Sequence, residues 1–378
     1  MVQNMSDWKE IPLGKVLEFG NGKVKPKRVG KIPIYGGNGI LGFGNDFNYE
    51  NETIIIGRVG AYCGSVYYEN RPIWVSDNAL AAKPKQNYDA KFIYYFLKHI
   101  DLNRWAGGSS HPLVTQTLLK SLEFSICTNP KVQCDIAEVL SSLDDKIDLL
   151  HRNNKTLEQM AETLFRHFFG LDTNDSWESV SAMECFRLIG GGTPATTQSA
   201  FWGGNIKWMS AKDITEAHKG FILSTEKTIT VSGLQNSSTK ILPKFATVIS
   251  ARGTVGKYCM LAEPMCFSQS NYGILPVDDE SFFFTHLLVA SLVKELQAAS
   301  YGTVFDTITT RTFSDIKVPL PPHELVKNFN EIVSPFFEKM LLNSQQMESI
   351  RKLRDSLLPK LIAGEIIVST ELPQSLVS

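Results

Sequence analysis

The glycine-rich stretch YGGNGILGFGN, residues 35–45, has the residue types and the spacing of a nucleotide site. Gly37, Gly39 and Gly42 fit the G-x-G-x-x-G pattern with which a backbone approaches the pyrophosphate of a dinucleotide. A true fingerprint lies between a strand and the helix whose N-terminus holds the phosphates. Here IPIY precedes the glycines, but FGNDFNYENET follows them and is too rich in Asn, Asp and Gly to open a helix. We therefore interpret the glycines as turns and expect no dinucleotide cofactor.

Other patterns that could do chemistry are missing from the sequence. The six cysteines include no C-x-x-C pair and the seven histidines have no H-x-x-x-H or H-E-x-x-H spacing, so we expect no metal site. A base-flipping adenine methyltransferase needs an Asp/Asn-Pro-Pro-aromatic motif, whereas Pro321 and Pro322 follow Leu320 and precede His323. No G-x-x-x-x-G-K-[ST] pattern occurs. We expect a protein that is not an enzyme by itself and has no cofactors.

Length and composition indicate a soluble protein of two or more domains. The chain has 378 residues, 43% of them hydrophobic and 20% charged, which is typical of globular proteins. The first residues contain no apolar stretch of signal-peptide length, and 18 consecutive apolar residues occur nowhere. We therefore predict a cytoplasmic protein without membrane contact.

Charge is distributed unevenly along the chain. The formal net charge is -1, yet residues 1–130 hold 15 lysines and arginines against 11 acids, while each later segment is slightly acidic. The marked basic run is KVKPKRVGK, residues 23–31. Such a run is more often a solvated loop than a phosphate-binding patch, so both interpretations stay open. Charge alone does not predict a nucleic-acid partner.

An internal repeat organises the whole chain. Sliding the sequence along itself by 193 or 194 residues brings TIIIGRVGAYCG over TVISARGTVGKYC and pairs Arg58 with Arg252. The same shift brings WVSDNAL over FSQSNYG and pairs Asn78 with Asn271. It also aligns GGSSHPLVTQTLLKSLEFSI with YGTVFDTITTRTFSDIKVPL. The chain is therefore predicted to be two copies of one unit of roughly 190 residues.

Each half ends in a long helical pattern whose apolar residues recur by alternating steps of four and three. Asn154, Asn343 and Arg354 interrupt this seam, and polar seam residues disfavour wrong registers and partners. For Arg354 a tolerated surface position is an equally open interpretation. Pro335 and Pro359 should kink or start helices locally, so we expect the second helix to be less regular than the first. We expect the helices to pair through Ile136, Leu140, Leu143, Ile147, Leu150, Asn154, Leu157, Leu164, Phe168, Phe329, Val333, Phe336, Met340, Asn343, Met347, Ile350, Arg354, Leu357 and Leu361.

The segments before the helices are rich in predicted strands. Short apolar runs such as TIIIG, SVYY and TVIS are separated by Gly, Asn and Asp clusters, which is typical of strands joined by tight turns. We predict an α+β fold with two tandem strand-rich domains that alternate with two long helices paired as an antiparallel coiled coil. The expected boundaries are a first domain at 1–130, a helix at 131–170, a second domain at 171–322, a helix at 323–366 and a tail at 367–378.

In this arrangement the chain resembles the specificity subunit of a type I restriction-modification enzyme, over essentially its whole length. The phrases that carry the resemblance are W-x-x-I/V-x-L at Trp8 to Leu13, VISARGTVGK, SQSNYG, and VPLPPHELVKNFNEIV leading into IRKLRDSLLPKLIAGEI. The first copy departs from the pattern at GRVGAYCG, and Trp177 is followed by ESVSAMECF without the leucine.

The resemblance implies a DNA-reading adaptor. Each globular unit would be a target recognition domain for one half of a bipartite, asymmetric site in double-stranded DNA. The helices would hold the domains apart and dock two adenine methyltransferase subunits, and motor and nuclease subunits would join through the complex. A helix of about 38 residues spans at most roughly 57 Å, which bounds the half-site centres to within roughly 17 base pairs.

Base reading requires donors and acceptors that reach groove edges, and loops held by strands are suited to carry them. A coiled-coil scaffold with two protein- or sugar-binding modules is the alternative, and the weak net charge favours it slightly. For each single residue, a role in a turn, a cap or a local ion pair also stays open. The predicted DNA-binding residues are Lys25, Lys27, Asn38, Arg58, Ser109, Ser110, His111, Lys212, Asp213, Arg252, Gln269, Ser270, Asn271, Thr303 and Arg311.

Overall fold

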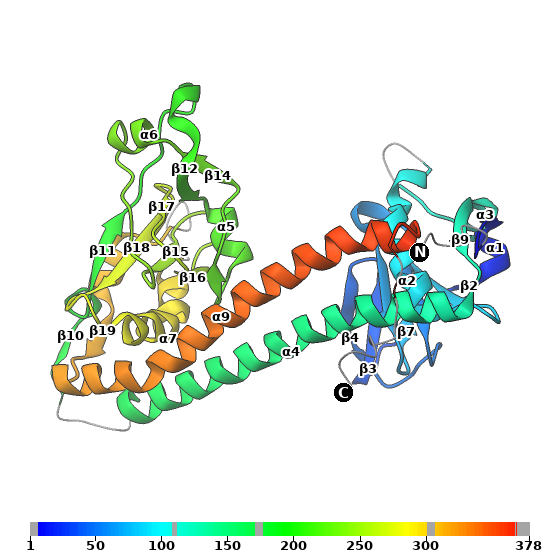
Figure 1. Ribbon diagram of the computed structural model, residues 1–378. Helices are drawn as coiled ribbons and strands as arrows, with labels where there is room; N and C mark the ends of the chain where they lie inside the picture. Colours follow the sequence, from blue (N-terminus) through cyan, green and yellow to red (C-terminus); the bar gives the residue numbers. More distant parts are fainter. Residues whose placement is uncertain (1–6, 108–111, 171–176, 301–306, 367, 369–378) are drawn as a thin grey trace, which may run out of the picture. The chain divides into compact units, whose positions relative to one another are not determined.

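The structure is a computed structural model, and contacts along its backbone divide the chain into two compact units. One unit comprises residues 1–147 with 349–378, and the other comprises residues 148–348. Each unit therefore contains one globular domain together with parts of both long helices (Figure 1). The residues that the structure describes are 7–107, 112–170, 177–300, 307–366 and 368.

The first unit is built on a four-stranded antiparallel sheet of order β2-β8-β5-β6, accompanied by a three-stranded sheet of order β4-β3-β7. A two-stranded ladder, β1-β9, joins the beginning and the end of the domain. Its elements are β1 (Trp8–Pro12), α1 (Leu13–Val16), β2 (Leu17–Asn21), β3 (Val29–Gly36), β4 (Gly39–Gly44), β5 (Thr53–Gly57), η2 (Gly60–Tyr62), β6 (Val66–Glu69), β7 (Trp74–Val75), β8 (Ala79–Pro84), α2 (Ala90–Ile100), η3 (Leu102–Trp105), α3 (Gln116–Ser121) and β9 (Glu123–Cys127).

The second unit repeats this plan with a sheet of order β11-β18-β15-β16-β13, a three-stranded sheet of order β14-β12-β17 and a ladder, β10-β19. Its elements are β10 (Ser179–Ser181), η4 (Ala182–Glu184), β11 (Phe186–Gly190), η5 (Ser199–Phe201), β12 (Trp202–Met209), α5 (Ala211–Glu216), β13 (Phe221–Ile222), β14 (Lys227–Ile229), α6 (Val231–Gln235), β15 (Thr247–Ser250), β16 (Tyr258–Leu261), β17 (Cys266–Phe267), β18 (Asn271–Pro276), α7 (Phe282–Ser300), α8 (Thr310–Asp315) and β19 (Lys317–Pro319).

The predicted α+β repeat is confirmed by this shared topology. The units differ in several connections, and the β3–β4 connection is one of them. Only Gly37 and Asn38 join β3 to β4, whereas residues 210–226, including α5 and β13, join the equivalent strands β12 and β14. The second unit therefore carries an additional helix and strand on the same framework.

One helix covers the larger sheet in each unit. Asp89 caps α2 by accepting a 2.7 Å hydrogen bond from the Phe92 N–H, and the apolar face of this helix is buried. Helix α7 is long and apolar enough to cross a membrane by length and composition alone. Its side chains, Phe283 and Leu287 among them, are buried in the apolar core of the second unit, so α7 is built as a core helix.

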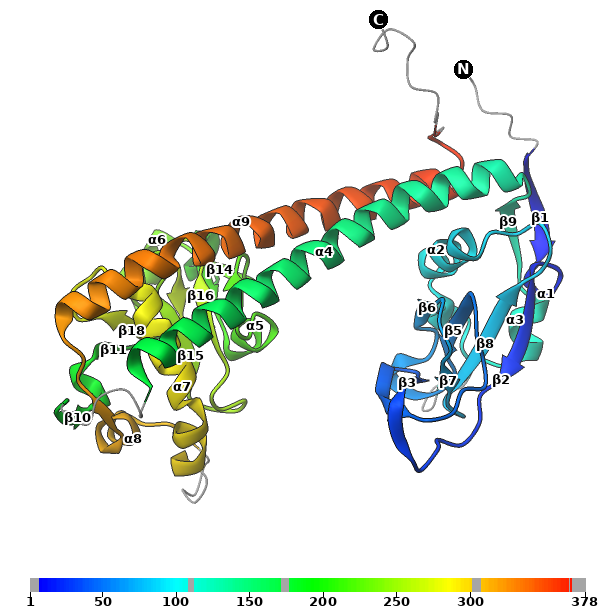
Figure 2. The same ribbon diagram turned by 90° about the horizontal axis from the view of Figure 1, so that it is seen from below.

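The two long helices are α4 (Pro130–Phe169) and α9 (His323–Ile362). Within each unit they lie side by side and antiparallel (Figures 1 and 2). Every predicted seam position from Ile136 to Leu361 is buried or half-buried. Helix α9 continues through Pro335 and Pro359, so neither proline starts a new helix. At Pro335 the helix faces solvent, where water can hydrate the carbonyl group that the proline leaves without a donor.

A buried histidine lies in the core of the second unit. The Nδ1 atom of His286 is 3.0 Å from the Thr247 Oγ1, and its ring packs against the rings of Tyr258 and Phe337. Burial lowers the pKa of His286 from 6.5 to about 4, because the charged imidazolium would lose its hydration. The folded protein therefore holds this side chain neutral.

The second unit should lose stability on mild acidification because of His286. In the unfolded chain this group takes up a proton near pH 6.5, but in the folded chain only near pH 4. The free energy of unfolding should therefore fall as the pH falls through this window, by about 2 kcal/mol at pH 5. Thermal unfolding at pH 7 and pH 5 should show a smaller loss for His286→Gln than for the unchanged protein. The control is His167→Gln on an exposed side chain, and equal losses in all three proteins would contradict the assignment.

Candidate nucleic-acid interface

In the first unit, the β3–β4 turn packs against the segment that follows β5. The Ser65 Oγ donates a 2.5 Å hydrogen bond to the carbonyl of Gly37. A Cβ atom added to Gly57 would lie 2.2 Å from the Tyr62 carbonyl oxygen and 3.2 Å from the Gly37 Cα, so this close crossing requires glycine. The crossing holds the exposed Asn38, at the tip of the turn, near Arg58, the residue that follows β5.

That residue, Arg58, is half-buried and fixed by its backbone. Its N–H donates to the Asn78 carbonyl at 3.0 Å, and its carbonyl accepts from the Val114 N–H at 2.9 Å. The side-chain Nε is buried without a hydrogen-bond partner, and the guanidinium forms no ion pair with the described residues. Because an unpaired buried donor costs free energy, Arg58 is suited to meet an outside acceptor such as a guanine edge.

The basic run at residues 23–31 lies on the loop between β2 and β3 and on the first residues of β3. Lys25 and Lys27 are exposed, and neither forms an ion pair within the described part of the chain. A Cβ atom on Gly42 would lie 3.8 Å from the Lys25 Nζ, so this ammonium group lies close to β4. The loop therefore brings uncompensated positive charge next to the exposed apolar side chains of β4, which are Ile40, Leu41 and Phe43.

In the second unit, three predicted segments meet around the turn at residues 251–256. The Thr215 Oγ1 of α5 lies 2.6 Å from the Thr254 Oγ1 of this turn. The Ala251 N–H donates to the Ser270 carbonyl at 2.9 Å, and the Ile308 N–H donates to the Ala251 carbonyl at 3.1 Å. The turn thus gathers α5, the loop before β18 and the start of α8.

The cations predicted for this face differ in how strongly the chain's own acids hold them. The Lys212 Nζ lies 2.9 Å from a Glu226 carboxylate oxygen, and this hydrogen bond raises the pKa of Lys212. Arg311 lies 3.6 Å from Asp315, one helical turn away. Arg252 is exposed and forms no ion pair among the described residues. Of these three cations, Arg252 is therefore the most available to an external anion.

Two predicted contacts of the second unit are corrected by burial. The carboxylate of Asp213 accepts from the N–H and Oγ of Ser210 at 2.8 and 2.6 Å and from the Glu226 N–H at 2.9 Å, so it caps α5. Asn271 is buried in β18 and donates from Nδ2 to the Ser268 Oγ at 2.7 Å. Because both side chains are buried, we do not propose them as base contacts. Their neighbours remain accessible, since Gln269 is exposed and Ser270 is half-buried.

The backbone also corrects the pairing of the two arginines. Ala251, and not Arg252, repeats the hydrogen bonds of Arg58, because its N–H donates to the loop before the strand β18 and its carbonyl accepts from the segment before a capped helix. Arg252 therefore corresponds to Val59. The alignment of Arg58 with Arg252 is wrong by one residue.

The two arginines lie at different distances before an equivalent left-handed glycine, because Arg58 is two residues before Gly60 and Arg252 is one residue before Gly253. In the first unit, Gly60 and Gly64 have φ values of 76° and 84°, and their counterparts Gly253 and Gly256 have values of 79° and 82°. The first unit thus has one more residue between its glycines. Successive side chains of an extended segment point to opposite sides. A difference of one residue therefore leaves the arginine half-buried in the first unit and exposed in the second.

Some predicted residues lie outside the described part of the chain, namely Ser109, Ser110, His111 and Thr303. The sequence interpretation overlooked Tyr62, whose exposed side chain lies near Gly37, and Thr254, which joins α5 to the turn. The signal for both was their position inside the aligned GRVGAYCG and ARGTVG segments.

The geometry offers no cofactor cradle at the glycine-rich stretch. Gly39 and Gly42 belong to the β4 strand of a hairpin, and the chain continues into a loop and then β5, with no helix to hold a pyrophosphate. Among the described residues, no group of three or more His, Cys, Asp or Glu side chains gathers around one point as metal ligands.

Comparison with known proteins points to one family. The profile described as "Type I restriction modification DNA specificity domain" matches residues 5–159 and 174–352. The type I restriction enzyme MjaIX specificity subunit of Methanocaldococcus jannaschii is 24% identical over 331 residues, which cover 81% of this chain and 76% of that protein. The HindI specificity subunit of Haemophilus influenzae is 26% identical over 334 residues, covering 68% and 72%. A crystal structure of a type I restriction-modification S subunit from M. genitalium has a TM-score of 0.66 at 19% identity and covers 96% of this chain and 98% of that one.

Replacing Arg58 should weaken DNA binding without weakening the fold. In Arg58→Ala the buried Nε without a partner disappears, so the thermal unfolding temperature should stay the same or rise. If Arg58 reads a base, affinity for a bound duplex should fall by about 1–3 kcal/mol, measured by fluorescence anisotropy. Arg71→Ala is the matched control, since Arg71 pairs with Glu69 at the other end of β5. Equal affinities for both variants would remove Arg58 from the interface.

Proposed function

The chain belongs to the family of type I restriction modification DNA specificity domains, and from this premise we propose that it reads a bipartite, asymmetric DNA site. It acts as the specificity subunit of a type I restriction-modification complex and is not an enzyme by itself. The observation that carries the proposal is the match of the family profile to both halves of the chain, at residues 5–159 and 174–352. Two recognition domains in one chain are suited to two half-sites.

Differences between the domains support half-sites of unequal sequence. The framework strands are arranged alike, but the β3–β4 connection is a two-residue turn and the β12–β14 connection carries α5 and β13. When the two units are aligned by their backbone hydrogen bonds, Arg58 and Arg252 also occupy positions that differ by one residue. Side chains of different length, direction and charge on one framework would read different base edges.

The charges further support unequal shares in holding the phosphate backbone. The run at residues 23–31 has five cations and no acid, and its Lys25 and Lys27 are exposed without ion pairs in the described chain. In the second domain, Lys207 pairs with Glu263, and Lys212 and Arg311 also pair with acids. We therefore propose that the first domain supplies most of the salt-dependent affinity of the isolated chain.

The outer faces of the long helices support docking of two copies of one partner. Exposed apolar residues occur at Leu149 and Met160 on α4 and, at the repeat-related positions, at Leu342 and Leu353 on α9, with 43%, 45%, 59% and 49% of each residue exposed. Exposed apolar side chains at equivalent repeat positions are suited to bind the same surface twice. We propose two methyltransferase subunits as the occupants, with motor and nuclease subunits joining through them, in the cytoplasm.

The first test of the proposal is a map of methylated adenines in the native host with and without this gene. Loss of methylation at one split motif, with two short unequal halves around a fixed gap, is the expected result. A strain that keeps the gene but carries Asp213→Asn is the control for folding. Asp213 caps α5 and lies outside the proposed base contacts, so this variant changes the fold locally and leaves those contacts in place. An unchanged map, with the partner methyltransferase expressed, would contradict the proposed function.

The docking proposal makes a separate prediction about stoichiometry. Leu149→Glu or Leu342→Glu alone should reduce the methyltransferase content from two copies to one per chain, and the double variant should bind none. Native mass spectrometry of the purified complex measures these states directly. The control is Ile241→Glu, which places the same charge at an exposed apolar residue outside the long helices. Two bound copies in the double variant would refute docking at these residues.

A further inference from the structure

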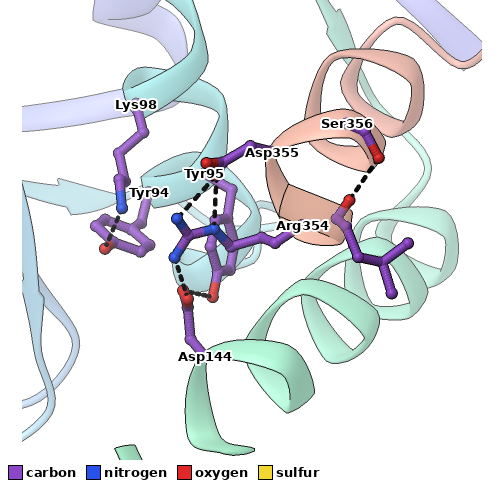
Figure 3. Close-up of polar contacts among 8 residues, drawn as sticks. Tyr94, Tyr95, Lys98, Asp144, Arg354, Asp355 and Ser356 are labelled. Carbon is purple, nitrogen blue, oxygen red and sulfur yellow. Dashed lines mark hydrogen bonds and ion pairs between the residues drawn. The ribbon is translucent and has the colours of Figure 1, made fainter. Parts of the chain in front are cut away.

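The first unit contains a polar cluster in the seam of the long helices (Figure 3). Arg354 of α9 donates from Nη1 to the Asp144 Oδ1 of α4 at 2.5 Å, and the Tyr95 OH of α2 donates to the Asp144 Oδ2 at 2.7 Å. Arg354 also donates from Nε and Nη2 to the Asp355 Oδ1. Both carboxylate oxygens of Asp144 are thus satisfied by residues of other helices.

This cluster is largely removed from solvent and keeps its charges. The side chains of Arg354 and Asp144 are only 20% and 27% exposed. Burial lowers the pKa of Arg354, but its hydrogen bonds to Asp144 and Asp355 outweigh this effect and raise the pKa overall. Burial and the hydrogen bond to Asp144 raise the pKa of Tyr95, so its hydroxyl keeps its proton. The cluster is therefore a charged pair with a neutral donor.

The second unit contains a different polar pair in the same seam. Asn343 of α9 donates from Nδ2 to the Asn154 Oδ1 of α4 at 2.8 Å. Asn154 in turn donates to the Met340 carbonyl and the Ser344 Oγ, each at 3.2 Å. Each asparagine therefore has its partner on the other helix. In both units a polar residue of α4 matches a polar residue of α9.

The internal repeat gives these polar residues apolar counterparts. At the helix offset of 193 residues, Asp144 corresponds to Phe337 and Arg354 corresponds to Ala161. Both counterparts are buried in the apolar core of the second unit, where the Phe337 ring stacks on Phe283 with centroids 4.7 Å apart. At these repeat-related positions the seam is polar in the first unit and apolar in the second.

Because the helices are repeats of each other, pairing of like helices from two chains is a competing arrangement. An antiparallel α4–α4 pair in the same register would place Asp144 against Ala161 of the other copy. An α9–α9 pair would place Arg354 against Phe337 of the other copy. The asparagines would likewise face apolar residues, since Asn154 and Asn343 would meet Leu150 and Met347. Every polar seam residue would then be buried without its partner, which is costly for charged groups above all.

We propose that the Asp144–Arg354 and Asn154–Asn343 pairs select the pairing of α4 with α9 over the pairing of like helices between two chains. The selection disfavours association of two chains through like helices. It resembles the use of a buried asparagine to fix partner choice in coiled coils. The inference is independent of DNA reading, so its test and the methylation map can fail separately.

Two full-length variants test this proposal by redirecting the pairing. Asp144→Arg places two cations at one seam position, and Arg354→Asp places two anions there. When the two variants are co-expressed with different tags, α4 of each chain finds the opposite charge only on α9 of the other chain. We expect reciprocal heterodimers, with copurification through one tag at least tenfold above that of two tagged unchanged chains.

Matched controls separate partner choice from misfolding. Two tagged copies of Asp144→Arg have no complementary charge and should not copurify above the background of the unchanged chains. The double variant Asp144→Arg with Arg354→Asp in a single chain should remain a monomer and unfold at a temperature closer to that of the unchanged protein than either single variant does. Background copurification of the mixed pair, or a double variant no more stable than the single ones, would overturn the proposal.

Discussion

The structure depends on the burial of one apolar seam by two helices of forty residues each. A stripe with a 3.5-residue period over such a length is not stable in water, and the partner that satisfies it is a second helix of the same pattern. In each unit the seam merges with the domain core, as Ile136 and Leu140 do in the first unit and Phe329 and Val333 in the second. The domains and the helices therefore stabilise one another through these shared cores.

Periodicity and repetition predicted the parts of the fold that depend on many residues at once. The seam and the duplicated strand-rich domains each rest on dozens of positions, so a few irregularities do not obscure them. Pro335 shows the reverse case, because the helix continues through a local helix breaker at a position that faces solvent. The role of Asp144 was also hidden, since its partners Tyr95 and Arg354 are remote in sequence.

The candidate site was predicted less well, because it depends on single residues and their register. Arg58 lies two residues before its left-handed glycine and Arg252 lies one residue before its own, and no residue type in either segment signals that difference. Asp213 and Asn271 have the chemistry of base-reading side chains, but both are buried, and the Asp213 carboxylate already accepts hydrogen bonds from its own neighbours. Whether a side chain can contact a base depends on its solvent exposure and on the hydrogen bonds it already makes. Both are properties of the folded chain.

The ladders β1–β9 and β10–β19 hold the two ends of each domain next to each other. Their strands lie about 4.8 Å apart, so the second domain leaves α4 and returns to α9 at nearly the same point, and the first domain enters α4 beside its own first strand. A different domain with the same terminal strands could replace it in a single recombination event, and the helices would meet unchanged chain ends. New combinations of half-sites would then arise by exchange of whole gene segments, without the gradual adjustment of contacts that a scattered interface requires.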